Sequence, residues 1–349
     1  MNRVYTAPII SKPDPLVQAL ALLGQAMSDV EATIIEATRS SVELIPEISN
    51  HLIVSGGKRI RPCLLLLFEK ACGNTGRARG VPLAVATELL HSATLLHDDV
   101  VDRGHLRRGV PSAPRVYGNA ACVLVGDFLL ARAFNMVVEH GDQILLLELT
   151  KVFTAMAEGE MLQLIRSGRV ALSRPDYVEI ISGKTAGLFS WCCRAGAALG
   201  DGRASGSAAR MAEEFGKNFG MAFQIIDDVL DYTAAPEQSG KDLANDLLQG
   251  KTTLPLLLAC EEDPTLLPVL ERVAAQGPDE TSCHQIVQRV LGTKAIARAI
   301  KAACTYTTKA CGCLVSIPGY PDAPAVNCLL TLARHIVDRA ESVGENVSR

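Results

Sequence analysis

The stretch ELLHSATLLHDDVVD, residues 88–102, places three aspartates at the end of an otherwise apolar run. From Val85 onward, apolar residues recur every three or four positions, which predicts a helix. On that helix Asp98 and Asp102 share one face, and Asp99 lies about 100° around the axis. Like charges at this spacing repel one another, and the C-terminal end of a helix disfavours anions. The stretch therefore predicts a core helix whose acidic end needs a cationic partner.

A second run, FQIIDDVLD at residues 223–231, repeats the spacing with Asp227, Asp228 and Asp231. A single run of this kind could be a solvated helix end, because charged residues usually lie at the surface. Two copies, each preceded by an apolar helix, are better explained by a common function in binding a ligand. Magnesium takes oxygen ligands and commonly uses one or two carboxylates together with waters and substrate phosphates. The pair of runs thus predicts Mg²⁺ shared with a diphosphate.

Basic residues adjoin both acidic runs. GGKRIRP at residues 56–62 combines a glycine pair with three cations at a predicted helix start, where side chains and backbone N–H groups can hold phosphate oxygens. Any one of these pairs in isolation would be read as solvated surface. Together they indicate two diphosphates, one held through metal and one held mainly by basic side chains. The candidates are Lys58, Arg59, Arg61, Arg107, Arg108, Lys241 and Lys251.

Composition excludes several classes of protein. The 349 residues carry a net charge of −4 and no long block of Lys or Arg, so we expect no nucleic-acid partner. No signal peptide is recognised and no window approaches about 18 uninterrupted apolar residues, so we expect no transmembrane segment and a cytoplasmic location. The 11 cysteines lack paired C-x-x-C spacing, which favours reduced core residues over a zinc site.

The apolar periodicity is helical throughout, and sustained alternation typical of strands is hard to find. The fold class predicted is therefore all-α, with helices alone. Glycine, proline and polar clusters divide the chain into helices expected near 15–45, 62–72, 81–102, 119–139, 142–165, 175–199, 205–232, 252–261, 280–292, 294–315 and 322–342.

At this point the residues match a known family. In order, GGKRIRP, ELLHSATLLHDDVVD, RRG, GNAACVLVGDFLLARAF, GKTAGLF, FQIIDDVLD and SGKDLANDLLQGKTTLPL resemble the trans-isoprenyl diphosphate synthases, specifically the long-chain polyprenyl (octaprenyl-type) diphosphate synthases. The match covers about residues 15 to 345. The resemblance implies one helical bundle around a central cavity, the isoprenoid synthase fold, spanning 1–349 with 1–14 flexible. It also implies a homodimer, with transient membrane association for product release.

The resemblance also implies roles for individual residues. Up to three Mg²⁺ ions, shared with the allylic diphosphate, would be held by Asp98, Asp99, Asp102, Asp227, Asp228 and Asp231. Isopentenyl diphosphate would be bound by Lys58, Arg61, His91 and Arg108. The allylic diphosphate would be bound by Arg107, Lys184, Lys241 and Lys251, and the catalytic centre would be lined by Lys184, Thr185 and Gln224. The implied reaction is the head-to-tail condensation of the two diphosphates, with a quinone side chain as the destination of a long product.

Product length is expected to depend on residues one turn before the first aspartates. Thr94 and Ala93 lie four and five residues before Asp98, about 6 to 7.5 Å deeper along the helix. Both are small, which favours a long product over the shorter ones of relatives with aromatic residues there; small residues on helices also serve close packing. The alternatives are a medium-chain (geranylgeranyl-type) synthase and a non-catalytic partner subunit. An allylic-diphosphate cyclase fits less well, because its second metal motif normally mixes Asn, Ser or Thr with Glu.

Overall fold

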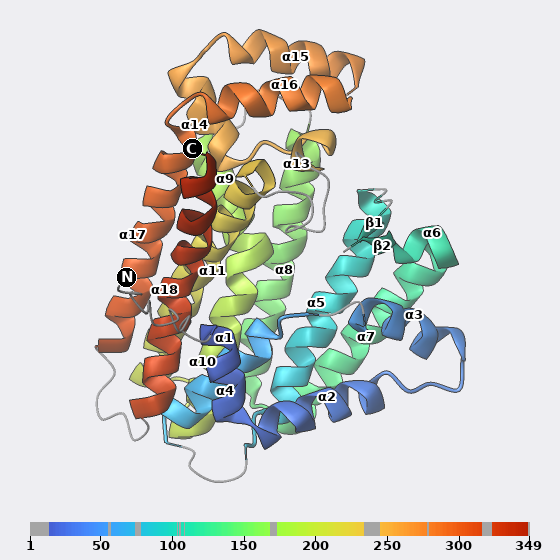
Figure 1. Ribbon diagram of the computed structural model, residues 1–349. Helices are drawn as coiled ribbons and strands as arrows, with labels where there is room; N and C mark the ends of the chain where they lie inside the picture. Colours follow the sequence, from blue (N-terminus) through green and yellow to red (C-terminus); the bar gives the residue numbers. More distant parts are fainter. Residues whose placement is uncertain are drawn as a thin grey trace, which may run out of the picture.

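The computed structural model describes residues 14–54, 57–73, 78–102, 104, 106–107, 109–167, 173–233, 245–277, 279–315 and 323–347 (Figure 1). The elements before the second aspartate run are α1 (Pro15–Leu23), α2 (Gln25–Ala37), α3 (Leu44–Val54), α4 (Ile60–Ala71), α5 (Val81–Val101), β1 (Leu106–Arg107), β2 (Val110–Pro111), α6 (Ala113–Tyr117), α7 (Asn119–His140), α8 (Gln143–Arg166), α9 (Arg174–Ile181), the π-helix η1 (Ser182–Ala186) and α10 (Gly187–Asp201). The remaining elements are α11 (Ser207–Thr233), α13 (Asn245–Leu248), α14 (Leu254–Glu262), α15 (Leu266–Gln276), α16 (Glu280–Leu291), α17 (Ala295–Val315) and α18 (Ala323–Val347).

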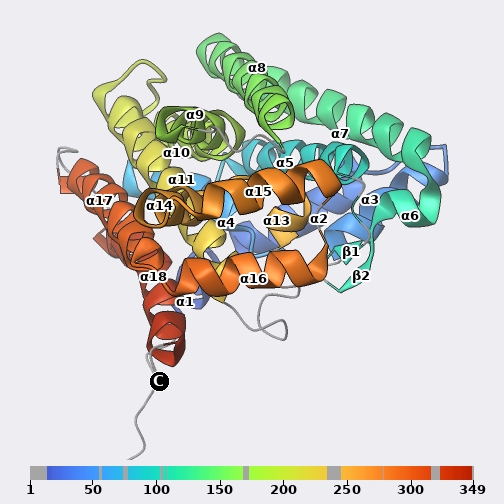
Figure 2. The same ribbon diagram turned by 90° about the horizontal axis from the view of Figure 1, so that it is seen from above.

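The long helices run roughly side by side, and α15 and α16 lie across one end of the bundle (Figures 1 and 2). Helix α11 packs against α10 on one side and against α17 on another, whereas α5 packs mainly against α7. This arrangement places the two aspartate-bearing helices, α5 and α11, in different parts of one bundle. The all-α prediction is confirmed by this architecture.

The core is centred on α4 and on the aromatic residues that meet it. Phe68 of α4 is fully buried and its ring lies 5.1 Å from that of Phe215 on α11, edge to face. The ring of Phe215 stacks on Phe219, and Phe219 lies 5.3 Å from Phe189 of α10. Aromatic pairs at such separations add to the free energy gained by burial. The cluster fixes α4, α10 and α11 relative to one another.

Glycines allow α10 to approach its neighbours closely. A Cβ atom on Gly196 would lie 2.0 Å from the carbonyl oxygen of Leu65 on α4. A Cβ on Gly216 of α11 would lie 2.4 Å from the carbonyl oxygen of Phe189. Atoms cannot approach this closely, so a larger residue at either position would force the two helices apart.

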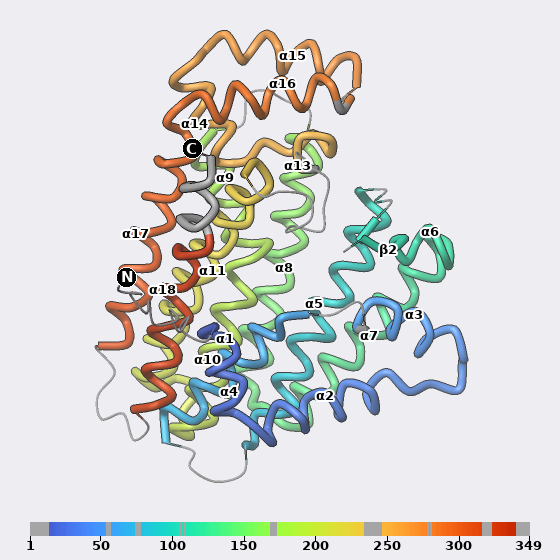
Figure 3. Tube along the Cα trace, in the orientation of Figure 1, coloured from blue at the N-terminus to red at the C-terminus, as the bar shows by residue number. Residues whose placement is uncertain are grey.

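The structure differs from the predicted pattern of helices alone. Strands β1 and β2 pair antiparallel, with Leu106 opposite Pro111, and Gly109 adopts φ 79°, a left-handed conformation that suits a tight turn. The single helix expected over 15–45 is wrong. The chain breaks at Gly24, with φ 42°, and turns again after α2 (Figure 3). Helices α3, α6, α13 and α15 were not predicted, because each is short or lacks a clear boundary signal.

Helix α7 needs separate mention. Within the described part of the chain it is the one helix long and apolar enough, by length and composition, to cross a membrane, and about a third of its apolar window is buried. It packs on α5, where His97 lies so close that a Cβ on Gly126 of α7 would meet its ring at 2.2 Å. Helix α7 thus has one face in the bundle and an apolar outer face that includes Leu124 and Val138.

All eleven cysteines lie in described residues and are free thiols. Cys63, Cys192 and Cys193 are fully buried, and burial raises the pKa of each thiol. Five of the eleven are buried and six are half-buried, so the prediction of core cysteines holds for Cys63, Cys122, Cys192, Cys193 and Cys283 only.

We expect Gly196→Ala to lower the free energy of unfolding by about 1–3 kcal/mol, because the new methyl group would collide with the backbone of α4. The matched control is Gly312→Ala on α17, where a Cβ meets nothing within 4 Å. That control should raise stability by up to about 1 kcal/mol, since alanine favours helix over glycine. Urea unfolding followed by circular dichroism measures both changes. Equal effects at the two positions would contradict the close-packing account.

Candidate active site

Both aspartate runs line one large cavity. It has a volume of about 1800 Å³ and lies between α5, α8, η1 and α11. The end of α5 contributes Asp98, Asp99 and Asp102 to its wall, and α11 contributes Asp227, Asp228 and Asp231. Residues separated by more than 120 positions in the sequence therefore face the same space, as the paired motifs predicted.

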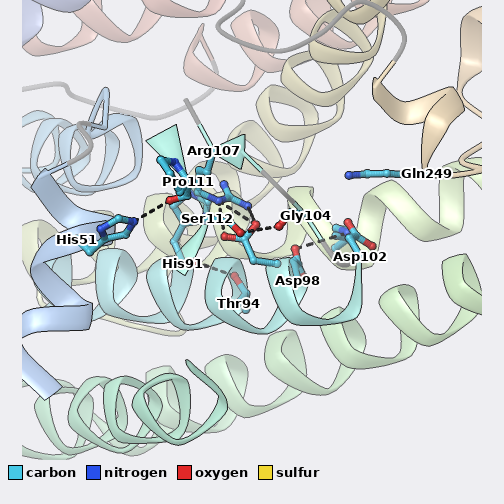
Figure 4. A network of polar contacts seen from close by, with 12 residues as sticks. His51, His91, Thr94, Asp98, Asp102, Gly104, Arg107, Pro111, Ser112 and Gln249 are labelled. Atoms are coloured by element: carbon cyan, nitrogen blue, oxygen red, sulfur yellow. Dashed lines mark hydrogen bonds and ion pairs between the residues drawn. The ribbon is translucent and has the colours of Figure 1, made fainter. Parts of the chain in front are cut away.

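Two lysines lie against the first aspartate run. The ammonium group of Lys251 donates a hydrogen bond of 2.7 Å to Asp102 and another, of 2.6 Å, to Gln249. The ammonium group of Lys184 lies 3.7 Å from Asp98. Figure 4 shows Asp98 and Asp102 on the same side of α5, with Gln249 approaching from a separate segment. The acidic end of α5 thus has the cationic partners that its sequence demanded.

Asp99 has a different partner. The guanidinium group of Arg107, on β1, grips its carboxylate with two nitrogens at 2.7–3.0 Å (Figure 4). Bidentate pairing of this kind is strong and fixes the geometry of both groups. Asp98 and Asp102 face the lysines, whereas Asp99 orients Arg107. The three aspartates, grouped by sequence as equivalent metal ligands, are therefore not equivalent in the structure.

The hairpin that carries Arg107 is tied down at two further points. The hydroxyl of Ser112 donates 2.5 Å to the carbonyl oxygen of Gly104, and Nε2 of His51 lies 3.0 Å from the carbonyl oxygen of Pro111 (Figure 4). Because His51 belongs to α3, the hairpin is fastened to a helix outside the loop itself. These contacts hold Arg107 at the cavity wall.

The second aspartate run is held by a chain of hydrogen bonds that sequence reasoning missed. Tyr177 of α9 donates 2.6 Å to one oxygen of Asp228, and the amide of Gln224 donates 2.8 Å to the other. The hydroxyl of Thr185 in turn donates 2.8 Å to the carbonyl oxygen of Gln224. Thr185 and Gln224, both predicted at the reacting centre, are thereby linked to the acidic run. Tyr177 lay outside every motif, so its part could not be read from the sequence.

Burial alters the acidity of these carboxyl groups. The pKa of Asp98 is raised to about 6, chiefly by burial, against the opposing attraction of Lys184. The pKa of Asp228 is raised well above its ordinary value, chiefly by burial and then by the negative charge of Asp246. A raised pKa means that the ionised form lacks full compensation. The cavity therefore favours the addition of positive charge beside these groups.

A π-helical turn places Lys184 in the cavity. Helix α9 runs into η1, which contains Lys184 and Thr185, and single π-turns within helices often mark functional sites. A Cβ on Gly183 would lie 2.5 Å from the carbonyl oxygen of Ala155, so this glycine allows η1 to pack directly on α8. Glu160 of α8 forms an ion pair with Lys184. Glu160 is a further cavity residue that the motifs did not indicate.

The predicted basic residues occupy another part of the same cavity. Lys58, Arg61 and His91 all line it. The guanidinium carbon of Arg61 lies 4.5 Å from the centre of the Phe189 ring, and its buried Nε has no hydrogen-bond partner. Burial lowers the pKa of Arg61. A buried donor without a partner is costly, so this position is suited to an anionic ligand that would accept from it.

The carboxylates suit magnesium shared with a ligand better than a metal held by protein alone. Among the described residues, no three His, Cys, Asp or Glu side chains are grouped closely enough to hold a metal by themselves. The cavity instead offers carboxylate oxygens on two walls, and Mg²⁺ usually takes few protein ligands and completes its shell with water and phosphate. The donor set therefore fits a magnesium ion bridged to a diphosphate.

The two positions expected to limit product length differ in the structure. Thr94 lines the cavity, whereas Ala93 is fully buried and is not part of the cavity wall. Successive helical residues point about 100° apart, and this rotation separates them. Helix α8 contributes apolar side chains to the cavity wall, among them the half-buried Phe153 and Met156. Of the two small residues, Thr94 alone has the placement that the length argument requires.

Two predicted ligands, Arg108 and Lys241, lie outside the described residues. Asp246 of α13 lines the cavity, and its backbone N–H donates 3.2 Å to Asp231. The signal for Asp246 was present in the stretch SGKDLANDLLQGK, but spacing alone did not distinguish it from a solvated acidic residue.

Comparison with known proteins agrees with this geometry. The family model described as polyprenyl synthetase matches residues 42–290. The all-trans-nonaprenyl-diphosphate synthase (geranyl-diphosphate specific) of Rhodobacter capsulatus is 37% identical, covering 92% of this chain and 97% of that protein. The octaprenyl diphosphate synthase of Escherichia coli is 35% identical, covering 91% and 97%. A polyprenyl synthase from Caulobacter crescentus, crystallised with calcium and isoprenyl diphosphate, superposes with a TM-score of 0.87 at 37% identity, covering 93% and 98%.

The raised pKa of Asp98 leads to a prediction about stability and pH. Protonation favours the folded state here, and this contribution is lost as pH rises through about 6, where Asp98 ionises in the folded chain. In chelator, Asp98→Asn should therefore exceed wild type in free energy of unfolding by about 1–2 kcal/mol at pH 8, and by about half as much at pH 5.

Urea unfolding at the two pH values measures this difference. Glu36→Gln, at an exposed carboxylate on α2 that pairs with Arg39, serves as the control and should show no such pH-dependent gain. A variant that is less stable than wild type at pH 8 would contradict the interpretation.

Proposed function

The chain belongs to the polyprenyl synthetase family and is a prenyltransferase, and we propose that it condenses isopentenyl diphosphate with an allylic diphosphate into a long-chain all-trans polyprenyl diphosphate. The observation that carries the proposal is the contact between Lys251 and Asp102, 149 residues apart, which joins the segment after the second aspartate run to the first run. The aspartates proposed as metal ligands, the basic residues and apolar side chains all line one cavity, which supports the proposal.

In this proposal the allylic diphosphate lies between the two aspartate runs. Asp98, Asp102 and Asp227 would hold Mg²⁺, and Lys184 and Lys251 would contact diphosphate oxygens. Bound Mg²⁺ would stabilise the negative charge that develops on the departing diphosphate. The calcium in the Caulobacter structure supports a divalent ion in such proteins. The family resemblance leads us to expect up to three Mg²⁺ ions, shared with the allylic diphosphate.

Isopentenyl diphosphate would lie on the basic side, at Lys58, Arg61 and His91. The unpartnered Nε of Arg61 supports this assignment, because a phosphate oxygen would satisfy it. With both substrates bound, the allylic C–O bond breaks and its electron pair leaves with the diphosphate. The isopentenyl double bond then attacks the allylic carbon, and a proton passes to the released pyrophosphate. Gln224 and Thr185 line the reacting centre, and the surrounding apolar wall excludes water.

The activity is tested with purified chain, labelled isopentenyl diphosphate and a series of allylic primers, with and without chelator. We expect elongation with Mg²⁺ and a loss of about 10²-fold or more in Asp227→Asn or in chelator, because charge stabilisation at the leaving group would be removed. Glu36→Gln, at an exposed ion pair on α2, is the control and should keep wild-type activity. Elongation that is insensitive to chelator would contradict the metal assignment.

A long product is the natural outcome of this cavity. Its volume is large, α8 contributes the apolar side chains of Phe153 and Met156 to its wall, and Thr94 is a small residue where a bulky one would close the space. The relatives named above make octaprenyl and nonaprenyl chains. A medium-chain product is the alternative, and chromatographic sizing decides between them. A non-catalytic partner subunit fits less well, because both aspartate runs and the described basic residues are in place.

We expect Thr94→Phe to shorten the product, because a ring at this position projects into the cavity. Ala93→Phe is the matched comparison, since the same ring there must enter the packed core and should cost about 1–3 kcal/mol of stability. Reverse-phase chromatography of dephosphorylated products and thermal unfolding measure the two effects. An unchanged product length in Thr94→Phe would refute this assignment of the cavity wall.

The apolar outer face of α7 supports a homodimer. Leu124 is 68% exposed and Val138, four turns further along the same face, is 62% exposed. A second copy of the chain would remove these side chains from water. Sedimentation velocity tests the proposal, which a monomer at micromolar concentration would contradict. We also propose that residues 1–349 form one domain, that the protein is cytoplasmic, and that it contacts a membrane transiently during product release.

A further inference from the structure

Arg59 has an unusual backbone conformation. Among the described residues it is the only one other than glycine with positive φ, at φ 49° and ψ 33°, and it stands directly before α4. This left-handed conformation costs an L-residue about 1–2 kcal/mol. Its side chain makes no hydrogen bond to the helix end, so capping does not compensate. Other contacts must hold Arg59 in place.

Those contacts come from two helices. Nε and Nη2 of Arg59 donate 2.6 and 3.2 Å to the two carboxylate oxygens of Glu31 on α2. Nη1 donates 2.9 Å to Glu88 on α5. The side chains of Arg59 and Glu88 are only 13% and 7% exposed. All three guanidinium nitrogens thus donate to carboxylates. The contact with Glu88 is mostly buried, where such bonds are strongest, whereas the Glu31 side chain is 48% exposed.

The same network reaches the residues proposed to hold isopentenyl diphosphate. Lys58 precedes Arg59, and Arg61 follows two positions later; both line the cavity. The negative charge of Glu88 opposes the lowering of the Arg61 pKa by burial, so one carboxylate stabilises two arginines. A Cβ on Gly57 would lie 3.1 Å from Nη1 of Arg59, so a larger residue there would press on the guanidinium group.

We propose that Arg59 is a positioning residue for isopentenyl diphosphate. Clamped by Glu31 and Glu88, it holds the backbone in the left-handed conformation that directs Lys58 and Arg61 towards the cavity. This inference rests on the proposed function. The competing explanation is that Arg59 itself binds a phosphate; its three occupied nitrogens argue against that role. Weakening the contact with Glu31 distinguishes the two explanations. If Arg59 positions its neighbours, the affinity for isopentenyl diphosphate would fall. If Arg59 binds a phosphate itself, freeing its guanidinium group would raise that affinity.

The test uses the full chain and isopentenyl diphosphate itself. Calorimetric titration and steady-state kinetics are compared for wild type, Glu31→Gln and Arg59→Gly. Glycine tolerates the left-handed conformation, so Arg59→Gly removes the clamp without backbone strain. We expect the Kd and KM for isopentenyl diphosphate to rise about tenfold in both variants, which corresponds to about 1.4 kcal/mol. The KM for the allylic diphosphate and kcat should stay within about twofold, since α11 and η1 are untouched.

Glu36→Gln is the matched control, because Glu36 lies on the same helix as Glu31 and forms an exposed ion pair with Arg39. It should leave both affinities unchanged. Wild-type affinity for isopentenyl diphosphate in Glu31→Gln and Arg59→Gly, with or without lowered thermal stability, would overturn the positioning role. Tighter binding in Glu31→Gln would also overturn it, in favour of Arg59 as a ligand. Failure of wild type to elongate any primer would instead refute the proposed function on which the inference rests.

Discussion

The constraint behind the whole structure is the gathering of carboxylates from two distant helices in one partly buried cavity. Burial raises the pKa of Asp98 and of Asp228, because their ionised forms lose water without full replacement. The protein supplies part of the missing positive charge through Lys184 and Lys251. The negative charge that the lysines do not compensate can attract divalent ions to this site. Burying these carboxylates destabilises the folded state, and the same buried charge favours the binding of cations.

Close helix packing brings these charges within reach of one another. Glycines let α10 approach α4 and α11, and they let the π-helical turn lie directly on α8. A residue with a side chain at position 183, in place of Gly183, would push η1 outward and take Lys184 away from Asp98. The small residues of this bundle therefore act on the chemistry through the backbone. Their contribution is geometric, and it costs helix stability that the aromatic core offsets.

The cavity is divided by charge and polarity into parts with different tasks. The aspartates and their lysines occupy one part, and Lys58, Arg61 and His91 occupy another. Apolar side chains of α8, including Phe153 and Met156, also line the cavity. Two anionic head groups and one growing hydrocarbon chain are the molecules that match these surfaces. Arg107 pairs with Asp99, and Arg59 pairs with Glu31 and Glu88. These acidic side chains hold the arginines in fixed orientations at the cavity.

The sequence alone determined the helical class, the two acidic runs and the basic residues beside them, because periodicity and charge spacing are local properties that any helix displays. Resemblance to a family added His91, Lys184, Thr185 and Gln224, which also line the cavity. It could not locate the breaks at Gly24 and at the π-turn, since both depend on what the neighbouring helices allow. Tertiary structure alone decided that Tyr177 holds Asp228, that Asp99 serves Arg107, and that Thr94 and not Ala93 faces the cavity. Each of these depends on the direction of a side chain relative to a partner far away in the sequence, and no spacing rule within one segment contains that direction.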